Sequence, residues 1–304
     1  MQDKFEGALV GLAVGDAVGT TLEFKPRGTF IPITDMEGGG PFRLRVGEWT
    51  DDTSMALCLA NSLIQHKGFN PEDQMNRYCN WWRVGYMSST GDCFDIGGTV
   101  MSALDNYIEH ADPFSGSTDE DTAGNGSLMR LAPIPIFYAS NKELAVKYAG
   151  ESSRTTHGAA ECIDSCRLFT SLIIESYNAA SKEAIFEQCA YQPYAPNVIE
   201  IANRSFMSKS YQELTGSGYV IESLESALWC FMNSDNFEEA ILLSANIGND
   251  ADTTAAICGQ IAGAYYGFSG IPEKWSNAIV MASEIKQWAS ELALIGEREC
   301  KTNL

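Results

Sequence analysis

Apolar residues recur every three or four positions along almost the whole chain of 304 residues. The first such run predicts a helix that ends near Gly15 and has one apolar face, made of Phe5, Ala8, Leu9, Leu12 and Ala13. Similar spacing predicts helices around 54–66, 72–87, 97–110, 142–151, 158–179, 182–190, 197–206, 221–233, 237–247, 253–267 and 273–295. Convincing period-2 runs are lacking, and Phe30 to Ile33 is the best short strand candidate. The sequence therefore predicts an all-α protein.

Nothing in the sequence divides the chain, which has no repeat, charge block or low-complexity linker. We therefore expect one compact domain over residues 1–304. Segments 25–48 and 111–127 are loop-like, and each leads directly into a motif. Loops of that length are usually functional or disordered, and we expect functional loops here. Small residues at every fourth position from Gly259 to Gly267 predict close packing between two helices in the core.

Two short acidic clusters stand at predicted helix starts, Thr50-Asp51-Asp52-Thr53 and Asn249-Asp250-Ala251-Asp252-Thr253. Helix capping with solvated charge is the simpler interpretation, since Asp and Thr cap well and the helix dipole favours an acid there. A cap uses one side-chain oxygen, however, so the second acid adds repulsion and no further cap. Carboxylate and hydroxyl oxygens suit Mg²⁺, Mn²⁺ or Ca²⁺ rather than zinc. Our hypothesis is that the two helix starts meet around a metal centre.

Further acids stand in apolar surroundings. Asp16 lies at the end of the first helix, and we expect it to be structural, bonded to backbone amides near its glycines. Glu23 follows shortly after. Asp95 is a lone carboxylate between apolar residues and a glycine pair, where it needs a cationic or hydrogen-bonding partner. A structural acid bonded to backbone amides is the alternative interpretation of Asp95.

Two polar segments precede other helix-like runs. Gly124-Asn125-Gly126-Ser127 is a glycine turn whose backbone N–H groups could bind an anion, and a plain turn is the alternative. His157 follows two threonines and precedes a helix. On its own it would be interpreted as a satisfied histidine near a helix start.

The charge balance excludes several classes of partner. Lys and Arg number 20 and Asp and Glu 40, which gives a net charge of −20 and makes a nucleic-acid partner improbable. The nine cysteines are odd in number and form no CxxC pair, which indicates reduced thiols in a reducing compartment. The sequence begins without signal-peptide features, and no stretch approaches the ~20 apolar residues of a membrane span. We expect a cytoplasmic protein with no membrane partner.

Together and in this order, the segments resemble the ADP-ribosylglycohydrolase family over roughly residues 5–268. A lone Asp-Asp or Gly-Asn-Gly would be weak, but the ordered set GDxxGxxxE, TDDT, FDIG, GNGSLMR, TH and NDADT is specific. The chain resembles most the bacterial dinitrogenase reductase-activating glycohydrolase branch, because the FDIG segment is typical of arginine-directed members.

The resemblance implies an all-α hydrolase that removes ADP-ribose from ADP-ribosylated arginine on a protein by cleaving the N-glycosidic bond. It also implies two divalent cations, Mg²⁺ or Mn²⁺, at the base of a cleft, with these ligands: Thr50, Asp51, Asp52, Asp250, Asp252 and Thr253. Asp95 and Glu23 would be catalytic, with Asp95 against the arginine guanidinium and Glu23 near the metals. The diphosphate and ribose would be bound by Gly124, Asn125, Gly126, Ser127 and His157.

Two other functions fit the same motifs. An immunity-type protein could bind and block a cognate ADP-ribosyltransferase toxin, with or without hydrolysis. A hydrolase could instead act on a free ADP-ribose derivative rather than on a modified protein. The intact set of acids favours an enzyme over a binding protein that has only kept the fold.

Overall fold

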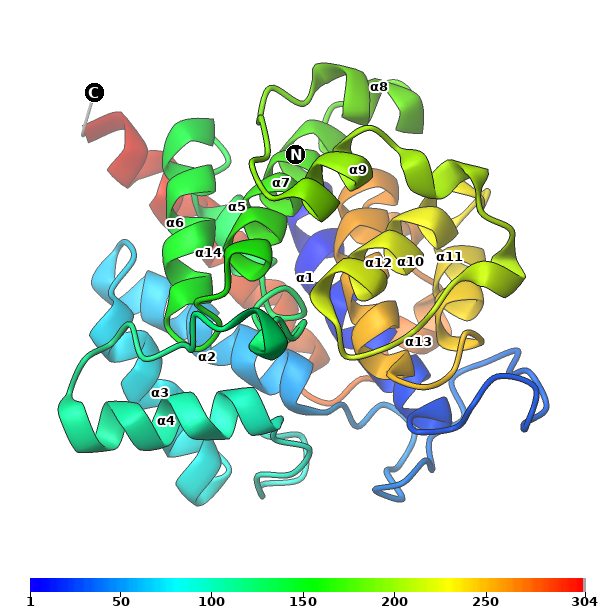
Figure 1. Cartoon of the computed structure of the whole chain (residues 1–304), viewed down its shortest axis with the longest axis horizontal. Helices are drawn as coiled ribbons and strands as arrows, with labels where there is room; N and C mark the ends of the chain where they lie inside the picture. Colours follow the sequence, from blue (N-terminus) through cyan, green and yellow to red (C-terminus); the bar gives the residue numbers. More distant parts are fainter. Residues whose placement is uncertain (303–304) are drawn as a thin grey trace.

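The computed structural model describes residues 1–302, and within them it contains α-helices and short 3-10 helices but no β-strand (Figure 1). The prediction of a single compact all-α domain is confirmed, although residues 303–304 of the predicted range lie outside the described residues. The α-helices are α1 (Gln2–Gly19), α2 (Asp51–His66), α3 (Pro71–Val84), α4 (Gly98–His110), α5 (Pro133–Phe137), α6 (Lys142–Arg154), α7 (Ala160–Ser176), α8 (Lys182–Gln188), α9 (Pro196–Ala202), α10 (Val220–Met232), α11 (Phe237–Ala245), α12 (Ala251–Tyr266), α13 (Glu273–Ser276) and α14 (Ala282–Thr302). The 3-10 helices are η1 (Thr20–Leu22), η2 (Glu120–Thr122), η3 (Ser205–Ser208), η4 (Tyr211–Glu213) and η5 (Phe268–Gly270).

The structure differs from the sequence prediction in several details, among them the short helix α5, which was not predicted. Helix α1 continues to Gly19, and the helix predicted over 273–295 is two helices, because the backbone at Met281 has a left-handed φ of 58°. Phe30 to Ile33, the best strand candidate in the sequence, is not a strand. Pro32 has no N–H to give to a partner strand, and the N–H of Ile33 donates to the Asn246 side chain at 2.8 Å.

Helices α1 and α12 lie side by side at the centre of the molecule (Figure 1). A β-carbon on Gly11 would stand 2.3 Å from the carbonyl oxygen of Gly259, and one on Gly7 would stand 2.2 Å from that of Gly263. The predicted close packing of the 259–267 segment is confirmed. Since the contacts run in opposite directions along the two helices, the end of α1 meets the start of α12. Gly19 accordingly contacts Ala251 and Asp252.

The central position of α1 explains its apolar sequence. Gln2–Leu22 is long and apolar enough to cross a membrane by length and composition, but 94% of its most apolar window is buried inside the protein. One segment therefore does reach the length and hydropathy of a membrane span, contrary to the expectation from the sequence. Burial within the protein core accounts for the hydropathy of this helix.

A second, smaller apolar core holds α2, α3 and α4 together. Its buried members include Met55 of α2, Tyr78 and Trp81 of α3 and Leu104 of α4. These helices lie at the lower left of Figure 1, beside the α1–α12 pair. The starts of α2 and α4 therefore face the junction between the end of α1 and the start of α12.

Candidate active site

The N-terminal ends of α2 and α12 meet through two crossed polar contacts. Thr50 Oγ1 lies 3.4 Å from Asp252 Oδ2, and Thr253 Oγ1 donates to Asp52 Oδ2 at 3.4 Å. The side chains of the N-cap residues, Thr50 and Asp250, make no capping hydrogen bond in either helix. The capping interpretation of the two acidic clusters is therefore wrong. The clusters face each other instead.

Asp16 is fully buried and is hydrogen-bonded to the start of α2. Its carboxylate accepts hydrogen bonds from the backbone N–H groups of Thr50 (2.9 Å) and Thr53 (3.1 Å) and from the hydroxyls of Thr50 (2.9 Å) and Thr53 (2.6 Å). The expected structural role is confirmed, but the partners lie at the start of α2 and not near the glycines of α1. Burial raises the pKa of Asp16 to about 6.

Glu23 and Asp95 join the junction from separate loops. One carboxylate oxygen from each lies within 4.8 Å of the other and of an oxygen of Asp252. Glu23 Oε2 and Asp52 Oδ1 are buried and have no hydrogen-bond partner. Asp95 is therefore not the lone carboxylate among apolar residues that the sequence suggested. Its backbone, with a left-handed φ of 60°, turns the side chain into a group of acids.

Six carboxylates form one acidic cluster at this junction: Glu23, Asp51, Asp52, Asp95, Asp250 and Asp252. The pKa values of five of them show how crowded the acidic cluster is. Burial and the charge of Asp95 raise the pKa of Glu23 to about 9, and burial and the charge of Asp250 raise that of Asp95 to about 7. Burial and the neighbouring carboxylates hold the pKa values of Asp51, Asp52 and Asp252 well above their usual range. A buried, oxygen-only donor set with two unpartnered oxygens fits a hard divalent cation. The acidic cluster could therefore bind a metal.

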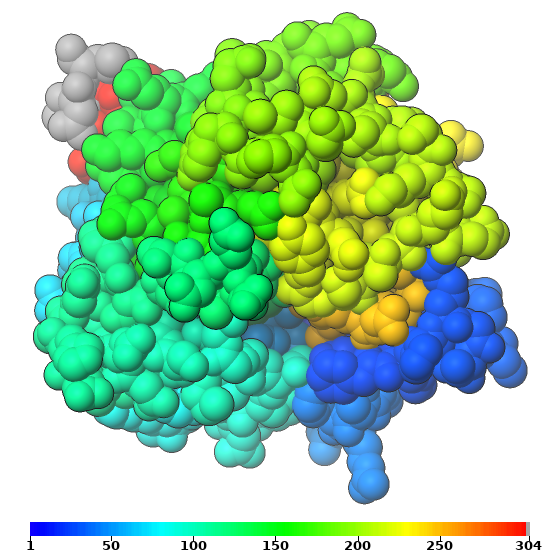
Figure 2. Space-filling view, viewed as in Figure 1, coloured from blue at the N-terminus to red at the C-terminus, as the bar shows by residue number. Residues whose placement is uncertain are grey.

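The acidic cluster forms the floor of an open cavity of about 320 Å³. Figure 2 shows the surface hollowed between the cyan-green side of the molecule and its orange and blue side. None of the described residues that line the cavity is Lys or Arg. Six predicted site residues lie at this floor: Glu23, Asp51, Asp95, Asp250, Asp252 and Thr253. Thr50 and Asp52 are fully buried and do not line the cavity.

The predicted glycine turn forms part of the cavity wall. Asn125 Nδ2 donates to Asp250 Oδ2 at 2.7 Å, and the Asn125 backbone N–H donates to the carbonyl of Gly218 at 3.0 Å. A β-carbon on Gly126 would stand 2.8 Å from Cε1 of His157, so the imidazole packs directly against the turn. Burial lowers the pKa of His157 to about 3, which leaves the ring neutral at physiological pH. Gly124 lines the same wall.

The structure places Ser127 differently from the other turn residues. Its hydroxyl lies 2.8 Å from that of Ser153 and is buried away from the cavity, because it already has this partner in the core.

Sequence reasoning missed the start of α4, where Gly98 and Thr99 line the cavity and the helix has no side-chain cap. Uncapped N–H groups at a 13-residue helix attract anions. The glycine pair at the start of the helix predicted over 97–110 was the available signal.

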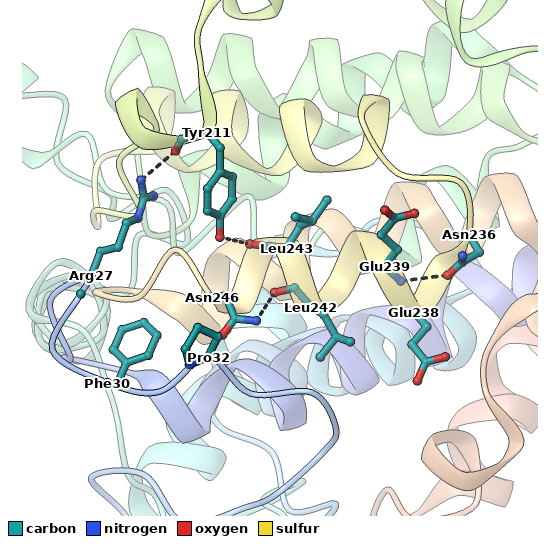
Figure 3. Close-up of a pocket in the computed structure, with 11 residues that line it drawn as sticks. Arg27, Phe30, Pro32, Tyr211, Asn236, Glu238, Glu239, Leu242, Leu243 and Asn246 are labelled. Atoms are coloured by element: carbon teal, nitrogen blue, oxygen red, sulfur yellow. Dashed lines mark hydrogen bonds between the residues drawn. The ribbon is translucent and has the colours of Figure 1, made fainter.

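A larger and more open hollow of about 710 Å³ lies elsewhere, lined by Phe30, Tyr211 and Leu242 among others (Figure 3). Arg27 borders it, donating hydrogen bonds to the carbonyls of Tyr211 (2.7 Å) and Ile247 (3.3 Å). None of the predicted site residues lines this hollow. The cavity over the acidic cluster is therefore the candidate active site.

Known proteins share this architecture and sequence. The family model described as ADP-ribosylglycohydrolase matches residues 1–302. The chain is 44% identical to an ADP-ribosylarginine hydrolase Tri1 of Serratia proteamaculans, over 98% of this chain and 81% of the relative. It is 28% identical to the ADP-ribosyl-[dinitrogen reductase] glycohydrolase of Rhodospirillum rubrum, over 93% and 92% of the two chains.

A solved structure agrees with these relatives. A chain of an "ADP-ribosylglycohydrolase-related protein complex" superposes with a TM-score of 0.86 at 40% identity, covering 97% of this chain and 98% of that one. The sequence motifs, the fold and the relatives lead to the same assignment. The chain belongs to the ADP-ribosylglycohydrolase family and is a hydrolase of that family.

Proposed function

We propose that this protein removes ADP-ribose from ADP-ribosylated arginine on proteins and uses two divalent cations, Mg²⁺ or Mn²⁺, to do so. The observation that carries the proposal is that carboxylate oxygens of Asp95 and Glu23 lie within 4.8 Å of an oxygen of Asp252, at the point where the N-terminal ends of α2 and α12 meet. Relatives that are 43–44% identical and are named ADP-ribosylarginine hydrolases support the choice of arginine.

The predicted ligands would share the cations between the two helix ends, with Thr50, Asp51 and Asp52 on one side and Asp250, Asp252 and Thr253 on the other. Contacts of 3.4 Å already join Thr50 to Asp252 and Thr253 to Asp52 across the two ends. Two acids of the acidic cluster, Asp52 and Glu23, keep an unpartnered oxygen. Bound cations would orient the ribose hydroxyls and offset the charge of the acids.

The protein's own groups would act at the two ends of the scissile bond. Cleavage of the bond between ribose C1″ and the arginine nitrogen builds positive charge on the ribose, which nearby carboxylates stabilise. Asp95 can accept two parallel hydrogen bonds from the guanidinium. The neutral His157 ring packs against the glycine turn, on the side where the ribose would bind. Its lowered pKa means that it does not serve as an acid at neutral pH.

The rest of the nucleotide would extend along the cleft. A hollow of about 840 Å³ adjoins the cavity and shares Thr99, Gly124 and Gly218 with it. The uncapped start of α4 and the glycine turn meet at these shared residues, and their N–H groups are suited to a diphosphate. We place the adenosine end in the adjoining hollow, which contains the aromatic side chains of Tyr194 and Tyr219.

Arginine- and serine-linked ADP-ribosyl peptides that differ only at the modified residue, each incubated with the protein and Mg²⁺ or Mn²⁺, would test the assignment. Release of ADP-ribose from the arginine-linked peptide is expected, with turnover of the serine-linked peptide at least ~30-fold slower. Equal or better turnover of the serine linkage would contradict it.

Crystals soaked in Mn²⁺ should show two anomalous peaks that touch both helix ends, and a single peak at one end would remove the binuclear claim.

A cognate ADP-ribosyltransferase and a cytoplasmic location are part of the same proposal. The nine free cysteines suit a reducing compartment. If protection against a transferase depends on hydrolysis, Asp252→Ala should abolish both activities in cells that express the toxin. Protection that survives the loss of hydrolysis would instead indicate an immunity protein that acts by binding.

A further inference from the structure

Three phenylalanine rings form a row at the edge of the catalytic cavity. The ring centroids of Phe24 and Phe42 are 6.3 Å apart, and those of Phe42 and Phe94 are 5.2 Å apart. Phe24 lines the cavity and is 66% exposed, while Phe42 and Phe94 are half-buried. Exposed apolar groups that gather in a patch, rather than singly, mark interaction sites.

The row is fixed to the catalytic acids through the chain itself. Phe24 directly follows Glu23, and Phe94 directly precedes Asp95. Oxygens of these two carboxylates lie within 4.8 Å of each other, so both outer residues of the row are chain neighbours of acids that meet in the cavity. Phe42, from the 25–48 loop, fills the space between the two rings.

The backbone holds the Phe24 ring outward at a cost in strain. Phe24 has a left-handed φ of 58°, which is a genuine outlier for a bulky residue. Its N–H donates to the carbonyl of Asn249 at 2.6 Å, and the N–H of Asn249 donates to the carbonyl of Lys25 at 2.8 Å. Strained positions of this kind concentrate at functional sites, where surrounding bonds maintain them.

We propose that Phe24, Phe42 and Phe94 form a docking row for the polypeptide that carries the modified arginine. The inference rests on the proposed function, because Asp95 and Glu23 then mark the arginine end of the substrate. The polypeptide attached to that arginine must leave the cavity beside these acids and therefore past the three rings. Apolar side chains next to the modified arginine would cover the rings and remove them from water.

The docking row makes the enzyme selective for protein-linked over free ADP-ribosyl-arginine. Phe42 is the residue to test, because it belongs to the row without lining the cavity. In the presence of metal, Phe42→Ala should lower kcat/KM for an arginine-ADP-ribosylated peptide about 10-fold, mainly through KM. For the free ADP-ribosyl-arginine conjugate, kcat/KM should stay within about twofold, since that substrate has no polypeptide to contact the row.

Two further variants control the experiment. Phe42→Tyr keeps the ring and should keep the preference for the peptide. Ile31→Ala removes an 88%-exposed apolar side chain of the same loop that is outside the docking row, and it should change neither substrate. Equal losses on both substrates, or no loss on the peptide, would overturn the docking row alone. If the unmodified protein turns over neither substrate, the proposed function fails, and the docking row with it.

Discussion

The hydroxyl of Thr50 lies 3.4 Å from Asp252 Oδ2, although 202 residues separate them in the sequence. The same hydroxyl donates its single proton to the nearer acceptor, Asp16 Oδ1, at 2.9 Å. A single threonine thus connects the end of α1, the start of α2 and the start of α12. Because five acids of the acidic cluster have raised pKa values, the metal-free junction is a place of electrostatic repulsion that a cation would relieve.

Asp52→Asn and Asp252→Asn should therefore cost metal binding without unfolding the protein. Loss of one ligand should weaken Mg²⁺ or Mn²⁺ binding by at least roughly 10–100-fold, the range seen even for partners beyond the ligands themselves. The melting temperature without metal should hold or rise, because one source of repulsion is gone. Titration calorimetry and thermal unfolding in chelator measure the two quantities.

The exposed acid Glu109 provides a control, since Glu109→Gln should alter neither quantity. If the metal-free Asp52→Asn or Asp252→Asn protein instead melts well below the unmodified protein, the acids are structural and the metal site loses its main support.

Asp95→Asn tests the guanidinium contact. The substitution keeps the shape of the side chain but removes the charge that would pair with the guanidinium. The loss of a charge-assisted contact is worth about 2–3 kcal/mol, so kcat/KM on arginine-linked substrate should drop at least ~30-fold. Because one Asp95 oxygen lies within 4.8 Å of Asp252, the assay should be run at saturating metal.

Binding of free ADP-ribose, which contains no guanidinium, serves as the control for Asp95→Asn. Its dissociation constant should change by less than about threefold at saturating metal. A parallel loss of ADP-ribose binding and turnover would show that Asp95 acts on the nucleotide or the metal and not on arginine.

Local patterns predicted most helices here because they depend on apolar spacing, which the sequence displays directly. The four-residue spacing of Gly259 and Gly263 likewise predicted a close helix contact, but it could not identify α1 as the partner. That pairing depends on carbonyl oxygens of Gly7 and Gly11, which are visible only once two distant segments are placed together.

The acidic cluster was predictable in membership but not in arrangement. The paired acids at two helix starts predicted that Asp52 and Asp252 meet, because one cap per helix left the second acid unexplained. The left-handed backbone of Asp95 was not foreseeable, since Phe and Ile beside it indicated an apolar environment. The burial of the Ser127 hydroxyl was not foreseeable for a similar reason, as its partner Ser153 lies 26 residues away.

Gly259→Ala tests whether the α1–α12 contact positions the acids. A β-carbon there would stand 2.0 Å from the carbonyl oxygen of Gly11, so the helices must separate. Overpacking of this kind costs about 1–3 kcal/mol, and the melting temperature should fall by several degrees. Because Asp252 lies at the start of α12, metal affinity should fall as well.

Gly68→Ala is the matched control, since its β-carbon would make an ordinary contact 3.6 Å from the Tyr138 hydroxyl. Its melting temperature and metal affinity should stay close to those of the unmodified protein. An unchanged melting temperature for Gly259→Ala would mean that the α1–α12 contact is looser than the structure shows.

The raised pKa values also predict how pH acts on the metal-free protein. The pKa of Glu23 is about 9 and that of Asp95 about 7 in the folded state, against ordinary values of 4.5 and 3.8. The folded protein therefore binds more protons than the unfolded chain at neutral pH, so its stability falls as the pH rises. His157 has the opposite sign, but its loss of stability begins only below its ordinary pKa of 6.5.

Thermal unfolding in chelator should accordingly show a melting temperature that falls by several degrees as the pH rises from 7 to 9. Added Mg²⁺ or Mn²⁺ should raise the melting temperature most at the alkaline end, because the metal displaces protons from the acidic cluster. The Asp52→Asn variant should show a shallower fall, because Asp52 is among the charges that raise the pKa of Asp51. Glu109→Gln should reproduce the slope of the unmodified protein. A metal-free melting temperature that rises from pH 7 to pH 9 would mean that the buried acids are already ionised and compensated within the protein, and that the acidic cluster does not need a cation.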